Sequence, residues 1–214
     1  MSDFDRMSSQ DKRRQAAATE RNRDAILDVL HKHLVDKGTI LELGSGSGEH
    51  AVYMAPRFPS YDWQPSDFDP DNLASIEAWR ESETVDNLLP AMHLDILDHR
   101  WPIEMLAPAK PISAILAINI IHIAPWDVTQ ALINGAGRVL ASGDTLYFYG
   151  PYKMDDEHTA ASNVQFDAWL KDRDQSWGVR SMEDVSDIAY SFGFSKPEIT
   201  PMPANNFSLV FKKL

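Results

Sequence analysis

A glycine-rich turn beside several carboxylates is the part of this 214-residue chain best suited to bind a ligand. Gly44, Gly46 and Gly48 alternate with serines in the run GSGSG, which follows the short apolar segment TILEL and precedes a helical segment. In this setting backbone N–H groups and a helix N-terminus converge on a negatively charged group, and glycines let the ligand touch the main chain. The sequence therefore predicts binding of one anionic group by Gly44, Ser45, Gly46 and Gly48.

The residues around the turn distinguish between two kinds of ligand. The dinucleotide fingerprint G-x-G-x-x-G/A needs a small residue at position 49, where this chain has Glu49. Glu42 lies two residues before the first glycine, where a strand that leads into a pyrophosphate site normally carries an apolar side chain. Two carboxylates repel a diphosphate but suit a cationic ligand. S-adenosylmethionine (SAM) has an ammonium, a sulfonium and a carboxylate that the turn can hold, so we expect SAM in preference to NAD.

Two further acidic residues follow β-prone segments downstream. Asp67 lies 19 residues after Gly48 at the end of an expected strand, where it can accept hydrogen bonds from the ribose hydroxyls of either NAD or SAM. Asp95, in the segment HLDIL, is placed to accept from an adenine amino group while Ile96 packs on the ring. Its alternative role is to cap its own turn. We also count Phe68, beside Asp67, among the cofactor-binding residues.

The candidate catalytic residues follow the fourth and fifth expected strands. His122, in the segment NIIH, has the ordinary pKa range of a general base, and the alternative is a packed or capping histidine ahead of Pro125. Asn119, in the same segment, is suited to orient the acceptor or the cofactor, or to close the turn by a hydrogen bond. Tyr149 ends the fifth strand, where its phenol either reaches the reacting group or packs as an aromatic side chain.

Alternating strands and helices must position these residues. The expected strands are 39–43, 61–66, 91–94, 111–118 and 145–149. The expected helices are 16–35, ahead of the first strand, and 50–58, 71–82 and 126–140 between the strands. Such alternation implies right-handed crossovers and a mainly parallel, doubly wound sheet, in which ligands bind at the carboxyl ends of the strands. Beyond residue 151 we expect a polar loop, helices at 166–170 and 181–192, and strands at 195–199 and 207–211.

Composition narrows the function classes. Apolar residues make up 43% of the chain, and 20 basic residues against 32 acidic ones give a net charge of −12. This charge disfavours nucleic acid as the main partner, and the absence of cysteine excludes thiol nucleophiles, disulfides and cysteine-ligated metals. We expect no metal site, no signal peptide and no membrane-spanning segment. The sequence thus predicts a cytoplasmic protein with a flexible segment, 1–15, and a single domain, 16–214.

Several segments also carry a resemblance to known proteins. ILELGSGSGEHA, SDFDPDNL and HLDILD together resemble class I SAM-dependent methyltransferases. ERNRDAIL, NIIHIAPW, YFYGPYK, SNVQFDAWL, WGVR and MPANNFSLVF resemble the family of domain of unknown function 938, from about residue 17 to the C-terminus. The resemblance implies an α/β, Rossmann-like seven-stranded class I methyltransferase fold, mainly parallel with an antiparallel C-terminal strand, and SAM as cofactor. It places Glu42 and the glycine turn at the methionine part, Asp67 at the ribose and Asp95 at the adenine.

The resemblance assigns some roles and leaves others open. It favours Arg21 and Asn22 closing over the cofactor carboxylate, although Arg21 alone could equally pair with surface acids. It names no methyl acceptor, which we expect to be a small molecule or a protein side chain, and it leaves the choice between monomer and homodimer open. The alternatives are an NAD(P)-dependent oxidoreductase and a non-catalytic SAM-binding interaction protein. Asp155 and Asp156 stand where the resemblance leads us to expect a glycine-containing turn.

Overall fold

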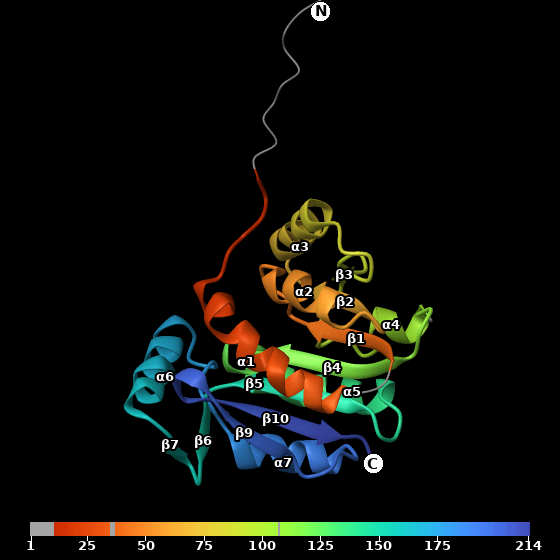
Figure 1. Ribbon diagram of the computed structural model, residues 1–214. Coiled ribbons are helices and arrows are strands. Elements are labelled where there is room, and N and C mark those ends of the chain that lie inside the picture. The colour runs from red at the N-terminus through yellow and green to blue at the C-terminus, as the bar shows by residue number, and fades with distance from the viewer. Residues whose placement is uncertain (1–10, 35–36, 107) are drawn as a thin grey trace, which may run out of the picture.

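A seven-stranded sheet in the order β3-β2-β1-β4-β5-β10-β9 forms the centre of the computed structural model, which describes residues 11–34, 37–106 and 108–214 (Figure 1). The strands are β1 (Gly38–Leu43), β2 (Tyr61–Asp67), β3 (Met92–His93), β4 (Ile112–Ile118), β5 (Thr145–Gly150), β9 (Glu198–Met202) and β10 (Asn206–Lys212). Strands β1 to β5 pair in parallel, whereas β10 is antiparallel to both β5 and β9. This confirms the predicted mainly parallel α/β sheet with an antiparallel C-terminal strand.

Helices cover both faces of the sheet. They are α1 (Ala17–His33), α2 (Glu49–Met54), α3 (Pro70–Glu83), α4 (Pro102–Met105), α5 (Trp126–Val139), α6 (Ala161–Arg173) and α7 (Met182–Ser191). Successive residues of β1 enter different cores: Ile40 packs with α1 and α2, and Leu41 packs with α5 and α7. The central strands are therefore buried on both sides, as their continuous apolar runs predict.

A second, smaller sheet was not predicted. Its strands β6 (Tyr152–Met154), β7 (Glu157–His158) and β8 (Arg180–Ser181) have the order β7-β6-β8, and α6 lies between β7 and β8 in the chain. Asp155 and Asp156 form the two-residue turn between β6 and β7, with φ of +52° and +61°. A left-handed turn explains why glycine was expected there, and aspartate is among the few other residues that tolerate this conformation.

Some predicted boundaries were wrong. The strand expected at 195–199 is β9, which begins at Glu198, because Pro197 has no N–H and the Ser195 hydroxyl accepts the N–H of Lys212 at 3.0 Å. The strand expected at 91–94 is only the two residues of β3. The helix expected at 166–170 is the longer α6, because the buried Asn163 bonds to the carbonyl of Asn205 at 3.0 Å, a tertiary contact. The end of the first predicted helix, at residue 35, lies outside the described residues.

The segment that precedes α1 lies along α3. The backbone N–H of Arg14 donates to the Ser75 hydroxyl at 2.8 Å, and the Trp79 indole donates to the Arg14 carbonyl at 3.0 Å. The Arg13 guanidinium donates to the Ser82 hydroxyl at 2.8 Å. These bonds place residues 13 and 14 against α3; the flexibility of 1–15 stays a prediction, and residues 1–10 lie outside the described part. Within the described ranges, no helix has the length and apolar character to cross a membrane.

Candidate functional site

A cavity of about 420 Å³ lies at the carboxyl ends of the central parallel strands. This volume falls within the range of about 300–1,000 Å³ that is usual for small-molecule sites. Six residues predicted to bind a cofactor line it together, from the ends of β1, β2 and β3: Gly44, Gly46, Asp67, Phe68, Asp95 and Ile96. Ile118 and Ile120, at the end of β4, add an apolar wall. The cavity thus lies where an open parallel sheet presents its ligand site.

The three glycines of the turn have different physical roles. All have positive φ: +60° at Gly44, +57° at Gly46 and +88° at Gly48. A Cβ at Gly44 would lie 2.3 Å from the Ile120 side chain, and one at Gly48 would lie 2.9 Å from the backbone of Ile76. A Cβ at Gly46 would meet nothing within 4 Å. Gly44 and Gly48 therefore permit close packing of protein on protein, whereas Gly46 leaves open space beside the cavity.

Asp67 is held in a fixed orientation at the cavity wall. It is 4% exposed; one carboxylate oxygen accepts the N–H of Gly46 at 2.9 Å, and the other accepts the N–H of Asp69 at 3.0 Å. An ionised carboxylate offers about four acceptor positions, so two hydrogen bonds leave capacity for two ligand hydroxyls. The backbone donors therefore orient the Asp67 carboxylate without occupying all of its acceptor positions.

Glu42 lies behind the turn, outside the cavity lining, on the sheet face that α1 and α2 cover. Its side chain is 2% exposed, and Oε2 accepts the Trp63 indole N–H at 2.9 Å. Burial raises the pKa of Glu42 to about 7; hydrogen bonds from Trp63 and Ser45 oppose this shift, and the charge of Asp67 adds to it. A carboxyl in this state ionises more readily when a cation is placed beside it.

Ser45 has a structural role in the turn. Its hydroxyl donates to the Glu42 carbonyl at 3.3 Å and accepts the N–H of Ser66 at 3.2 Å, and its own N–H donates to the Ser66 carbonyl at 2.9 Å. These bonds hold the turn against the end of β2. Ser45 is not among the residues that line the cavity, so the structure does not bring this predicted cofactor-binding residue to it.

A polar cluster lies between α1, α2 and the end of β5. Asn22 is 5% exposed and its Oδ1 lies 2.8 Å from His50 Nε2. Burial raises the pKa of Tyr149, opposed by a hydrogen bond with Asn22 and by the charge of Arg21. Burial and the charge of Arg23 lower the pKa of His50 to about 4. The structure thus brings the predicted residues Arg21, Asn22 and Tyr149 together on the α1 side, apart from the lining of the cavity.

Asn119 bonds to Tyr149 of this cluster and stands in the chain between Ile118 and Ile120, which line the cavity. It directly follows β4, has a φ of +61°, and its N–H donates to the carbonyl of Tyr149 at 2.8 Å. A non-glycine residue in the left-handed region at the end of a central strand is held there by its surroundings and is often found at functional sites. The bond to Tyr149 joins the ends of β4 and β5 through the backbone and does not involve the Asn119 side chain, whose role stays a prediction.

The environment of His122 does not suit a general base. The side chain is fully buried, its ring packs edge-on against Tyr152 at 5.0 Å, and Nδ1 accepts the N–H of Arg180 at 3.4 Å. Among the described residues Nε2 has no hydrogen-bond partner, and a Cβ at Gly150 would lie only 2.4 Å from it. Burial and the charge of Arg180 lower the pKa of His122 to about 3. The geometry favours the alternative considered from the sequence, a packed histidine.

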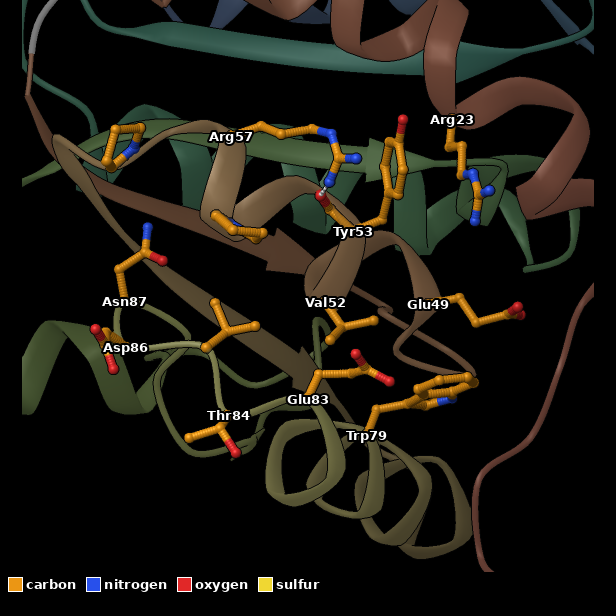
Figure 2. Close-up of a pocket in the computed structure, with 13 residues that line it drawn as sticks. Arg23, Glu49, Val52, Tyr53, Arg57, Trp79, Glu83, Thr84, Asp86 and Asn87 are labelled. Atoms are coloured by element: carbon orange, nitrogen blue, oxygen red, sulfur yellow. Dashed lines mark hydrogen bonds between the residues drawn. The ribbon is translucent and has the colours of Figure 1, made fainter.

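A larger groove of about 760 Å³ lies between α2 and α3, on the outside of the molecule (Figure 2). Tyr53 and Arg57 are on one wall and Trp79 and Glu83 on the opposite one. The Arg57 guanidinium lies 3.6 Å from the centre of the Tyr53 ring, and Arg23 lies 4.4 Å from it. None of the predicted cofactor-binding or catalytic residues lines this groove, so we take the smaller cavity as the candidate site. In the described part of the chain, no three His, Asp or Glu side chains are arranged to hold a metal ion.

Several residues of the site were not predicted from the sequence. Asn72, Ile118, Ile120 and Trp177 line the cavity, and His50 contacts Asn22. His50 lies two residues after Gly48, so its spacing from the glycine turn could have indicated its place in the site. Trp177 lies in WGVR, far from the strands that form the cavity, and only the folded chain brings it there.

Comparison with solved structures identifies the fold. SibL, an S-adenosylmethionine-dependent methyltransferase, matches with a TM-score of 0.72 at 14% identity, over 92% of this chain and 55% of that one. An O-methyltransferase family protein from Burkholderia thailandensis matches at 0.73 and 13% identity, over 89% and 55%. Geranyl diphosphate C-methyltransferase from Streptomyces coelicolor A3(2) matches at 0.68 and 10% identity, over 89% and 79%. The chain thus has the Rossmann-like methyltransferase fold, and it spans about 55% of the length of the first two proteins.

The family follows from the sequence itself. The model of the family described as "Protein of unknown function (DUF938)" matches residues 13–213. The chain belongs to this family, as the resemblance in its segments predicts.

Proposed function

We propose that the protein is a SAM-dependent methyltransferase and that the 420 Å³ cavity binds the adenosine part of the cofactor. The observation that carries this proposal is the arrangement of Asp67: it is buried at the cavity wall, oriented by two backbone N–H groups, and able to accept two more hydrogen bonds. The open space beside Gly46 is what a ligand in contact with the backbone requires. The neighbours with this fold carry methyltransferase names, which supports the same activity.

Each part of the cofactor has a matching part of the site. Asp67 takes the ribose hydroxyls, and Asp95 takes the adenine amino group while Ile96 packs on the ring. The Asp95 Oδ1 also accepts the N–H of Leu97 at 2.9 Å, so the turn-capping role and the ligand role act together. The methionine end lies toward Glu42, where an ammonium compensates the buried carboxyl.

The chain's own contribution to methyl transfer is mainly positioning. When bound, SAM supplies a methyl group that its sulfonium activates. Holding an acceptor in line with that methyl supplies much of the rate enhancement, and no protein nucleophile is needed. Asn119 and Tyr149, at the ends of β4 and β5, orient the acceptor in this proposal, with Arg21 and Asn22 closing over the methionine end. We assign His122 a packing role.

Glu49 weighs against the oxidoreductase alternative. Its Oε2 accepts a hydrogen bond from the Ser47 hydroxyl at 3.1 Å and also contacts the N–H of Ala16. The side chain thus ties the turn to the segment before α1. A carboxylate at this position repels the second phosphate of a dinucleotide, so SAM fits better than NAD(P).

Calorimetric titration with SAM, S-adenosylhomocysteine (SAH) and NADH tests the cofactor. We expect SAM and SAH to bind, NADH not to bind, and Asp67→Asn to weaken both bound ligands strongly because an amide donates where the ribose hydroxyls donate. Asp62→Asn is the matched control, since Asp62 pairs with Lys110 at 2.7 Å at the opposite end of β2. A well-folded wild type that binds NADH and neither SAM nor SAH would refute the proposal.

Radioactive methyl transfer tests for the acceptor, which we propose to be a small molecule or a protein side chain. Wild-type protein and Gly46→Asp are incubated with tritiated SAM and either metabolite or protein extracts. We expect labelled product with wild type only. SAM binding without label in either extract, together with a stable copurifying partner, would favour the non-catalytic interaction protein.

A further inference from the structure

A segment that follows α6 closes one side of the cavity. Trp177 lines the cavity together with Ile123 and Pro125, which follow β4. The N–H of Gly178 donates to the His122 carbonyl at 3.0 Å, so the two segments are joined directly beside Trp177. An indole ring therefore forms part of a cavity whose other residues come from the strand ends, the segments that follow them, α3 and the start of α5.

The Arg180 side chain holds these two segments together. Its Nε donates to the carbonyl of Ile121 at 3.0 Å, and its Nη2 donates to the carbonyls of Ala124 at 2.6 Å and Ser176 at 2.9 Å. Its guanidinium lies 5.4 Å from the centre of the Trp126 ring. Across the described residues, no carboxylate lies within ion-pair distance of Arg180. Three backbone carbonyls thus satisfy a half-buried guanidinium, an arrangement that its rigid fork of donors permits.

The position of Trp177 in the cavity indicates which part of a ligand it meets. The ribose end is fixed by Asp67, and the glycine turn holds the side toward the methionine. Apart from Asn72, Asp95 and Asp127, the other lining residues are apolar, and they include Ile96, Ile123 and Trp177. A flat heteroaromatic base fits between such walls, because stacking on an aromatic side chain is favourable for any base.

We propose that Trp177 is a base-binding wall of the cofactor site and that Arg180 is its positioning residue. The ligand it meets is the adenine of an adenosine-containing cofactor, so this inference rests on the proposed function and deepens it. Arg180 acts without touching the ligand: it fixes the distance between the segment of Trp177 and the segment of Ile123 and Ala124.

Tryptophan fluorescence during titration with SAH tests the role of Trp177. We expect SAH to change the emission of the wild type, and Trp177→Phe to abolish most of that change. Trp169→Phe is the matched control, because Trp169 is 47% exposed on α6, where it stacks on Phe166 at 5.7 Å. It should respond as the wild type does. Trp177→Ala should weaken SAH binding about tenfold, or about 1.4 kcal/mol, because one base–aromatic stack is lost.

Two variants test Arg180. Lysine offers a single ammonium and cannot bond to three carbonyls in fork geometry, so we expect Arg180→Lys and Arg180→Gln to weaken SAH binding and to reduce the emission change. Arg173→Lys is the control, since Arg173 lies 3.4 Å from the Trp169 ring, away from the cavity. Circular dichroism verifies that the secondary structure of each variant is intact. A merely stabilising role would lower the melting temperature without altering the emission change at saturating SAH.

Two outcomes separate this inference from the function on which it rests. If wild type binds SAH in the calorimeter and the Trp177 and Arg180 variants keep its affinity and its emission change, the inference is overturned and the proposed function stands. If folded wild type does not bind SAH at all, both are overturned.

Discussion

Glu42→Gln should make the folded protein more stable at alkaline pH and at the same time weaken cofactor binding. The substitution removes a buried acid but keeps an oxygen that can accept the Trp63 indole N–H, which lies 2.9 Å from Glu42 Oε2. Burial raises the pKa of Glu42 from 4.5 to about 7. Each unit of difference between the folded and unfolded pKa corresponds to about 1.4 kcal/mol, so ionising Glu42 costs the folded state about 3 kcal/mol.

The direction of the pH dependence follows from the raised pKa. Between about pH 4.5 and 7 the folded state keeps the proton that the unfolded chain has already lost. The free energy of unfolding of the wild type therefore falls as the pH rises through this window and stays low above it. The variant lacks this contribution and should lose about 2.5 kcal/mol less between pH 5 and pH 8.

Cofactor binding should show the opposite dependence. An ammonium beside Glu42 favours the ionised carboxylate, so SAH affinity of the wild type should rise with pH across the same window. Glu42→Gln should bind SAH more weakly at pH 8, with little pH dependence. Such an exchange of stability for binding is common where a site contains a buried charge.

Urea unfolding at pH 5 and pH 8, with SAH calorimetry at both values, measures the two effects. Glu157→Gln is the control, because Glu157 is an exposed acid on β7. Identical pH dependence of unfolding in wild type and Glu42→Gln would show that Glu42 does not have the raised pKa. Unchanged SAH affinity at pH 8 would show that no cationic part of the ligand lies beside it.

Three further predictions concern backbone space and the buried histidine. Gly46→Ala and Gly143→Ala should each lose about 1 kcal/mol of stability in thermal unfolding, because both positions have positive φ and open surroundings. Only Gly46→Ala should also lose SAH affinity in calorimetry. Equal affinity in the two variants would contradict a ligand beside Gly46. Gly150→Ala should lower the free energy of unfolding in urea by about 1–3 kcal/mol, because the new Cβ would lie 2.4 Å from His122 Nε2. A loss as small as that of Gly143→Ala would count against this packing. The pKa of His122 is lowered from 6.5 to about 3, so the stability it contributes is present above pH 6.5 and is lost as the pH falls toward 3, by about 3 kcal/mol at pH 4. His122→Asn should remove this part of the acid dependence of the free energy of unfolding. An unchanged pH dependence of thermal unfolding between pH 7 and pH 4 would refute the assignment.

The cavity residues that the sequence predicted share one property: each lies at the end of a strand or within a few residues after it. Asp67 is the last residue of β2, Gly46 and Asp95 follow β1 and β3, and parallel pairing places these strand ends at one edge of the sheet. Local spacing therefore suffices to place them together. Trp177 and Asn72 reach the same cavity from helical regions and their connections, whose positions depend on tertiary packing.

His122 shows the limit of reasoning from residue type. Its position after β4 correctly places it near the strand ends, but the segment that contains Gly178 and Arg180 covers it, and burial then lowers its pKa. That segment lies more than fifty residues further along the chain. No local pattern around NIIH indicates that another segment covers His122. The sequence therefore leaves its two roles, general base and packed histidine, equally open.

A crystal structure of the protein with SAH tests the central claim most directly, namely that the cavity at the strand ends is an adenosine site. We predict both ribose hydroxyls within hydrogen-bond distance of the Asp67 carboxylate and the adenine beside Asp95 and Ile96. SAH bound in the groove between α2 and α3, or soaked NADH lying across residues 44–48 in place of SAH, would contradict the account.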